Sequence, residues 1–274
     1  MRKVKDNLLR GLLWLSAFLT VAVLVTIVGY IFYKGYRLIN IDFILGDYSP
    51  TGDGGIWPMV VTTIYTIAIS LLIATPIGIL AAVYLQEYAK QGRLVKVIRF
   101  ATESLTGIPS IIYGLFGAVF FVTTLKLGMS IIAASLTLTI IVLPVIIRTT
   151  EESLKTVPHS YREGSLALGT TKLQTLYKVI LPSAMPGILS GIILSIGRIV
   201  GESAAIFLTA GTVAAMPDSI FSSARTLTVH SYLVTQESGD IELAAAVGIV
   251  LIVIILVLNL SATFISKKLN KADY

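Results

Sequence analysis

The stretch from Arg148 to Pro182 reads RTTEESLKTVPHSYREGSLALGTTKLQTLYKVILP. It is polar and charged and lies between two strongly apolar runs, so we expect it to sit in water, outside a bilayer. Between Pro158 and Gly169 its apolar and small residues recur at helical spacing. The pattern predicts a short helix with an apolar face that its own chain has no room to bury, which is typical of a docking element.

The composition of the whole chain is that of a membrane protein. Of its 274 residues, 55% are hydrophobic and only 13% are charged. The net charge of +6 would suggest a nucleic-acid partner in a soluble domain, but the basic residues cluster in segments expected at one membrane face. We therefore expect membrane lipid, and no nucleic acid, as a partner. Cysteine is absent, which excludes disulfides and Cys-based metal sites.

Six apolar runs are long enough to cross a bilayer, which predicts an all-α integral membrane protein with six transmembrane helices. The predicted spans are Leu8–Tyr33, Ile56–Tyr84, Thr102–Leu125, Ile131–Ile147, Pro186–Ala210 and Ile241–Ile265. Pro76 predicts a kink or break in the second span. The glycines and proline of SLTGIPSIIYGLFG, which opens the third span, allow close helix contact or local unwinding.

The distribution of basic residues predicts the orientation. Sixteen of the 21 Lys and Arg residues lie in the segments that six spans place on the side of the two termini, and four lie in the opposite segments. Because positive charge favours the cytoplasmic side, we expect both termini and the polar insert in the cytoplasm.

The fifth span carries charge inside an apolar run. If its helix begins near Pro186, Arg198 lies near the middle of the slab, and Glu202, four residues on, projects from the same face. An arginine at that depth costs at least about 2.5–3.5 kcal/mol on insertion scales. We expect Arg198 to offer a charged fork to an anion in transit and Glu202 to orient it. The alternative is a self-neutralising pair that stabilises the bundle.

Arg148, at the inner end of the fourth span, is the other candidate for anion binding, and an arginine that merely reaches the membrane surface is the alternative. His159 and His230 both fall in aqueous segments, and neither has a Cys, a second His or a carboxylate at ligand spacing. We therefore expect two surface histidines and no metal site.

The insert resembles the Glu-Ala-Ala, Gly, Ile-x-Leu-Pro loop of ABC importer permeases. The resemblance rests on Glu163-Gly164-Ser165, Gly169 and Val179-Ile180-Leu181-Pro182, with Gly164 and Ser165 where the family usually has Ala. It implies a coupling helix that sits in a groove of a cytoplasmic ATPase. The residues it assigns to ATPase coupling are Arg162, Glu163, Gly164, Ser165, Leu168, Gly169, Leu181 and Pro182.

Three further stretches narrow the resemblance: GGIWPMVVTTIYT, GIPSIIYGLFG and GRIVGESAA are similar to stretches of the A-type permease subunits of phosphate-specific ABC importers. Arg198 and Glu202 match the Arg and Glu of the family's Gly-Arg-x-x-Gly-Glu run, where Ser203 stands in place of the usual Thr, and by the same resemblance Arg148 matches an Arg of the transport path. The resemblance implies a type I permease fold: a first helix and external loop at 1–55, a core at 56–266 with the coupling loop 148–182, and a basic tail at 267–274.

It also implies the partners: a sister permease of the C type, two copies of an ATPase and an external phosphate-binding protein, in a prokaryotic cytoplasmic membrane. No Gly-x4-Gly-Lys-Ser/Thr motif occurs, so we expect ATP and Mg on the ATPase, and neither a cofactor nor enzyme activity on this chain. The expected function is import of inorganic phosphate by alternating access. A permease for another oxyanion and an ion-coupled secondary transporter are alternatives; an intramembrane hydrolase is disfavoured because no Asp lies in spans two to six.

Overall fold

The computed structural model describes residues 2–49, 54–90 and 92–271, and in this part of the chain there are helices and no strands. The elements are α1 (Arg2–Gly35), η1 (Tyr36–Leu38), α2 (Ile41–Leu45), α3 (Trp57–Val83), η2 (Tyr84–Tyr88), α4 (Arg93–Thr106), α5 (Ser110–Gly117), η3 (Ala118–Thr124), α6 (Ile131–Thr156), α7 (His159–Ala167), α8 (Lys172–Thr175), η4 (Leu176–Ile180), α9 (Leu181–Val200), α10 (Ala204–Thr209), α11 (Leu227–Leu233), η5 (Val234–Ser238) and α12 (Ile241–Lys271). Parts of the predicted external loop, 50–53, and of the predicted tail, 272–274, lie outside the described residues.

Among these elements, five helical segments are long and apolar enough to cross a membrane. The remaining predicted span, the third, Thr102–Leu125, is not one straight helix. Its residues fall on α4 and on the continuous pair α5–η3, which meet at a bend of 100°. The predicted count of six therefore holds only if this bent pair is one span.

The bend has a local cause. Gly107 ends α4, and Pro109, which has no backbone N–H to donate, precedes the first residue of α5. The Tyr113 hydroxyl donates a hydrogen bond of 2.7 Å to the Leu105 carbonyl oxygen, so a side chain of the second helix holds the end of the first. The local unwinding that the Gly and Pro residues allow occurs here.

The second span behaves differently, because α3 continues from Trp57 to Val83 with Pro76 inside it, and the predicted break is absent. Gly78, two residues after Pro76, lies against α6: a Cβ at this position would meet Ile146 at 2.6 Å. The absence of a side chain at Gly78 thus allows α3 to approach α6 closely.

The centre of the bundle is α6. In its most apolar window 61% of the residues are buried, against 39% or less in every other candidate span of the described chain. It packs on α3 on one side and on α9 on another. Gly187 and Gly191 of α9 face Ser153 and Thr149 of α6 so closely that a Cβ would clash with either hydroxyl side chain. Small residues therefore set the contact between α6 and α9.

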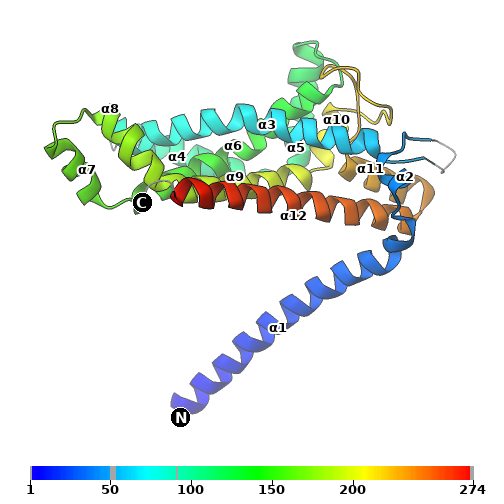
Figure 1. Cartoon of the computed structure of the whole chain (residues 1–274), viewed down its shortest axis with the longest axis horizontal. Coiled ribbons are helices and arrows are strands. Elements are labelled where there is room, and N and C mark those ends of the chain that lie inside the picture. Colours follow the sequence, from blue (N-terminus) through cyan, green and yellow to red (C-terminus); the bar gives the residue numbers. More distant parts are fainter. Residues whose placement is uncertain (1, 50–53, 91, 272–274) are drawn as a thin grey trace.

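Figure 1 shows the two ends of the bundle. α7 and α8 lie at one end, near the C-terminal end of α12, and α2 and α11 lie at the opposite end. α1 meets α12 where Gly35 approaches the backbone of Ala246 and then diverges from the bundle, so the apolar middle of α1 is exposed. This arrangement places the polar insert and the second long polar segment, 211–240, at opposite ends.

Candidate functional site

The predicted docking helix is present as α7, from His159 to Ala167. Its outward face is uncovered in this chain: Tyr161 is 49% exposed and Leu168, directly after the helix, is 86% exposed. Glu163 and Gly164 are exposed as well. Tyr161 and Leu168 of the predicted face are therefore free to contact another molecule, whereas Ser165, which was also expected on that face, is buried.

Arg162, assigned by resemblance to ATPase coupling, points back into the bundle. Its guanidinium forms an ion pair of 2.6 Å with Glu87 of η2, and both side chains are less than one-fifth exposed. It also donates to the carbonyl oxygens of Val157 at 3.1 Å and Leu154 at 3.2 Å, near the C-terminal end of α6. Arg162 thus ties α7 to the ends of α3–η2 and of α6.

Three hydroxyl groups close the loop that follows α7. Ser165 lies within 2.8 Å of the Thr170 hydroxyl oxygen and 3.0 Å of that of Thr175, and the two threonines are 2.9 Å apart. Gly169 turns the chain between them with a φ of 82°, which a residue with a side chain rarely adopts. Ser165, which departs from the family's usual Ala, is therefore a buried link inside the loop.

Leu181 and Pro182 lie apart from the other predicted coupling residues, which are in α7 or directly after it. They form the first turn of α9, where Leu181 packs against a core cluster that includes Leu154 and Ile188. α8, η4 and α9 make one continuous helical segment, Lys172–Val200, of 29 residues. The predicted start of the fifth span near Pro186 is wrong, because the helix begins in the polar insert itself.

The predicted shared face of Arg198 and Glu202 is also wrong. Helix α9 ends at Val200, so Arg198 lies in its last turn, where the helix dipole favours a cation, and Glu202 lies beyond the end. Glu202 is 8% exposed and accepts a hydrogen bond of 3.1 Å from the backbone N–H of Ala205, in the first turn of α10. Within the described residues, Arg198 forms no ion pair with Glu202 or any other carboxylate.

The end of α9 faces the bend between α4 and α5. Tyr113, whose hydroxyl donates to the Leu105 carbonyl oxygen across the bend, belongs to the same core cluster as Ile199 and Val200 at the end of α9. Close packing joins the same elements, since a Cβ on Gly114 of α5 would lie 2.8 Å from the Cα of Ala205 in α10. The bent pair α4–α5 and the broken pair α9–α10 therefore pack together, and transporters use such broken helices to place polar backbone beside a solute path.

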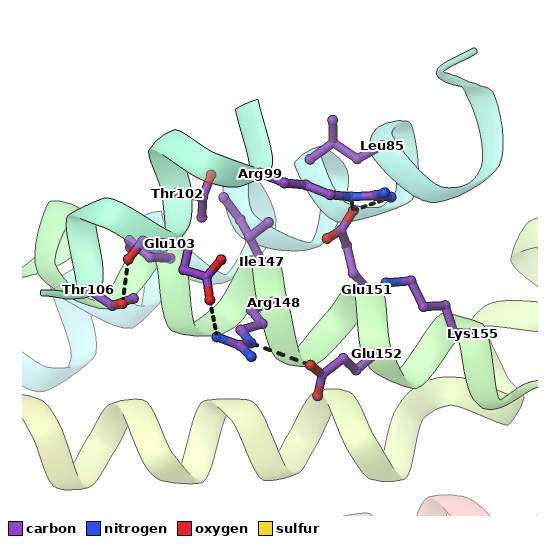
Figure 2. A pocket seen from close by; sticks show the side chains of 11 residues that line it. Leu85, Arg99, Thr102, Glu103, Thr106, Ile147, Arg148, Glu151, Glu152 and Lys155 are labelled. Carbon is purple, nitrogen blue, oxygen red and sulfur yellow. Dashed lines mark hydrogen bonds and ion pairs between the residues drawn. The ribbon is translucent and has the colours of Figure 1, made fainter. Parts of the chain in front are cut away.

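Arg148 lies in a different place, in a cavity of about 210 Å³ between α4 and α6. Figure 2 shows it between two carboxylates, Glu103 at 3.5 Å and Glu152 at 3.4 Å. All three side chains are more than half exposed, so these pairs stabilise the protein by only about 0–1 kcal/mol each. Arg99 and Glu151 form a shorter pair of 3.1 Å in the same cavity, and the Glu151 side chain is 8% exposed.

The structure does not bring Arg148 and Arg198 together. Thr149, next to Arg148 on α6, faces Gly191 of α9, and Arg198 lies seven residues further along α9. Seven helical residues span roughly 10 Å along the axis. The two arginines are therefore separated along the bundle and cannot grip one small anion at the same time.

His230 is buried, contrary to the predicted surface position, whereas His159 is exposed as predicted. His230 is 3% exposed, and burial, together with the neighbouring positive charge of Arg225, lowers its pKa to about 4. Sequence reasoning also missed Arg225, which is 8% exposed in the polar segment 211–240. The sequence could have singled it out, because Arg225 is the one Lys or Arg residue between Gly211 and Asp240.

Known proteins resemble this chain along its whole length. Residues 74–271 match the model of the family described as "Binding-protein-dependent transport system inner membrane component". The "Probable ABC transporter permease protein YqgI" of Bacillus subtilis is 36% identical over 290 aligned positions, which cover 98% of this chain and 99% of that protein. The "Phosphate transport system permease protein PstA 1" of Mycobacterium tuberculosis is 34% identical over 215 positions, covering 77% of this chain and 70% of that protein.

A solved structure agrees with the fold. A chain of a bacterial alginate ABC transporter superposes with a TM-score of 0.67 and 16% identity, covering 98% of this chain and 95% of that chain. The predicted all-α permease fold is confirmed by this likeness. The chain belongs to the family of binding-protein-dependent transport system inner membrane components, multi-pass membrane permeases of ABC transporters, which act with partner subunits.

Proposed function

We propose that the chain is the PstA-type permease subunit of an importer that moves inorganic phosphate across the cytoplasmic membrane at the expense of ATP. The observation that carries the proposal is the 34% identity, over 77% of the chain, to a protein named as a phosphate transport permease. The partners would be a PstC-type sister permease, two PstB-type ATPase subunits that bind ATP and Mg, and a PstS-type phosphate-binding protein. Both termini and α7 would face the cytoplasm.

Movement of the ATPase would reach the transport path through α7. The uncovered face of α7 supports docking, with Glu163, Gly164 and Leu168 as the contacting residues. A displacement of α7 would pass through Arg162 and Glu87 to α3, and through the continuous segment Lys172–Val200 to Arg198. The two bodies of the permease pair would then open alternately to the outside and the inside.

Arg198 and Arg148 would bind the anion one after the other. Arg198 has no carboxylate partner within the described residues. An oxyanion can therefore accept hydrogen bonds from its guanidinium without breaking an ion pair. Arg148 is held by two exposed carboxylates whose attraction is weak, so it can exchange them for a departing anion. Glu202 would keep the turn between α9 and α10 in place.

The test is uptake of radiolabelled phosphate by vesicles that carry the complete importer. We expect uptake that requires ATP and the binding protein, and that excess unlabelled phosphate suppresses while sulfate does not. No uptake of radiolabelled phosphate, together with ATP-dependent uptake of radiolabelled sulfate in the same vesicles, would show a permease for another oxyanion. Uptake by the permease pair alone, driven by an ion gradient, would show a secondary transporter.

A further inference from the structure

A cavity of about 340 Å³ lies at the end of the bundle opposite α7. It is far larger than the roughly 10–15 Å³ that one water molecule requires. Residues of both outer segments line it: Tyr48 and Gly55 from the first, and Arg225, His230, Glu237 and Asp240 from the second. None of these residues has a part in the transport path described above.

Arg225 is the unusual member of this lining. It is 8% exposed, and its Nε has no hydrogen-bond partner. Its guanidinium forms no ion pair with any residue that the structure describes, and its one stabilising neighbour is the ring of Tyr48, 4.7 Å from the guanidinium carbon. Burying a cation without a hydrogen-bond acceptor destabilises the fold. The unpaired donors of Arg225 are therefore better explained by a ligand that accepts from them.

The backbone around Arg225 is fixed. Its own N–H donates to the Val213 carbonyl oxygen at 2.9 Å, the N–H of Ala224 donates to Ala210 at 3.2 Å, and that of Leu227 donates to the Thr63 hydroxyl at 3.0 Å. The backbone that carries Arg225 is therefore fixed, and the Tyr48 ring packs on its guanidinium, so less freedom is left to lose when a ligand binds.

The same cavity also offers acceptors. Glu237 and Asp240 are exposed and line it, yet neither forms an ion pair with Arg225, so the positive and negative groups stay apart across the space. His230 also lines the cavity, and its Nδ1 has no partner. An oxyanion that still carries a proton fits such a lining, because it accepts from the arginine and donates to a carboxylate. Hydrogen phosphate carries that proton at neutral pH, whereas sulfate carries none.

We propose that this cavity is an outer binding site for protonated phosphate, with Arg225 donating to the phosphate oxygens and Glu237 or Asp240 accepting from its hydroxyl group. The inference rests on the proposed function for the identity of its ligand. It adds a receiving site at the outer face and a physical reason for choosing phosphate over sulfate before the anion reaches Arg198.

The test is equilibrium binding of radiolabelled inorganic phosphate to the assembled importer in nanodiscs, without the external binding protein. We expect Arg225→Gln to weaken binding at least roughly tenfold, as loss of a charge-assisted hydrogen bond does. Arg37→Gln is the matched control, because Arg37 is an exposed arginine of the first outer segment that does not line the cavity. Sulfate should not displace phosphate from the wild type but should displace it from the Glu237→Gln, Asp240→Asn double variant.

Unchanged phosphate binding by Arg225→Gln, or equal displacement by sulfate from the wild type, would overturn the site. Thermal unfolding separates a site from a structural role: removal of an unpaired buried charge should leave the melting temperature unchanged or raise it, whereas a clear fall would overturn the proposal. Phosphate uptake by the wild-type importer, measured in parallel, tests the proposed function independently. If the wild-type importer takes up phosphate normally and Arg225→Gln binds phosphate as the wild type does, the outer site is disproved and the proposed function stands.

Discussion

Arg162 and Arg225 are both largely buried, at opposite ends of the bundle, but their surroundings differ. Arg162 has a carboxylate and two backbone carbonyl oxygens as acceptors. Arg225 has an aromatic ring and, within the described residues, no acceptor. A buried arginine whose donors are all used holds a structure together, whereas one whose donors are unused is ready for a ligand. Arg198 resembles Arg225 in this respect, because it too forms no ion pair within the described residues.

The strongest test of the comparison is Arg198→Ala. If Arg198 binds the transported anion, loss of its donors should lower phosphate uptake by about 100-fold or more, since each charge-assisted hydrogen bond contributes roughly 1.5–3 kcal/mol. Assembly with the partner subunits should be unchanged, as measured by size-exclusion chromatography. Normal uptake by this variant would return Arg198 to a structural role.

The paired arginine should behave in the opposite way. Arg162→Met leaves Glu87 without its partner in a mostly buried position, so we expect a loss of stability of roughly 3 kcal/mol and a lower melting temperature. The charge-swapped double variant, Arg162→Glu with Glu87→Arg, should recover part of the loss. Glu152→Gln, which removes an exposed partner of Arg148, is the control and should change stability by less than about 1 kcal/mol.

The pH dependence of stability tests whether His230, in α11, is buried as the structure shows. Its pKa is lowered to about 4 in the folded chain against 6.5 for an ordinary histidine, so the unfolded chain takes up a proton first as pH falls. The stabilisation is present above pH 6.5 and should decline by roughly 2 kcal/mol at pH 5. The melting temperature of the wild type should therefore fall more between pH 7 and pH 5 than that of His230→Gln. Equal falls would mean that His230 is not shielded from water.

The smallest expected effect concerns the loop that closes α7. Gly169→Ala places a side chain at a φ of 82°, which should cost about 1–2 kcal/mol. Gly164→Ala is the matched control: this glycine is helical, and a Cβ there would meet nothing within 4 Å, so alanine should be neutral or slightly stabilising. Melting temperatures of both variants measure the difference. Equal effects would show that the turn tolerates a side chain.

Local patterns predicted much of the fold. Hydropathy located the five uninterrupted spans, and helical spacing located α7 to within two residues at each end, because both signals depend on neighbours in sequence. The end of α9 at Val200 was missed because only three residues, Gly201, Glu202 and Ser203, separate it from the next apolar stretch, which begins at Ala204 in α10. The shared face of Arg198 and Glu202 failed for the same reason.

Ion pairs between residues that are far apart in the sequence could not be predicted from local patterns. Arg162 and Glu87 are 75 positions apart, and Arg99 and Glu151 are 52 apart, so no spacing rule joins them. Arg162 was assigned by resemblance to the ATPase contact, and its side chain in fact turns inward. The buried position of His230 likewise depends on how the polar segment 211–240 folds against the segment that precedes α3, which polarity alone does not determine.

The unbroken segment Lys172–Val200 has a mechanical consequence. Twenty-nine helical residues make a rod of roughly 40 Å, and a rod of that length turns a small rotation into a large displacement. A tilt of about 5° at the α7 end would carry the turn that holds Arg198 through roughly 3–4 Å. That distance exceeds the length of a hydrogen bond. If Arg198 binds the anion as proposed, a rotation of a few degrees at α7 is enough to carry its guanidinium into or out of hydrogen-bonding distance of that anion.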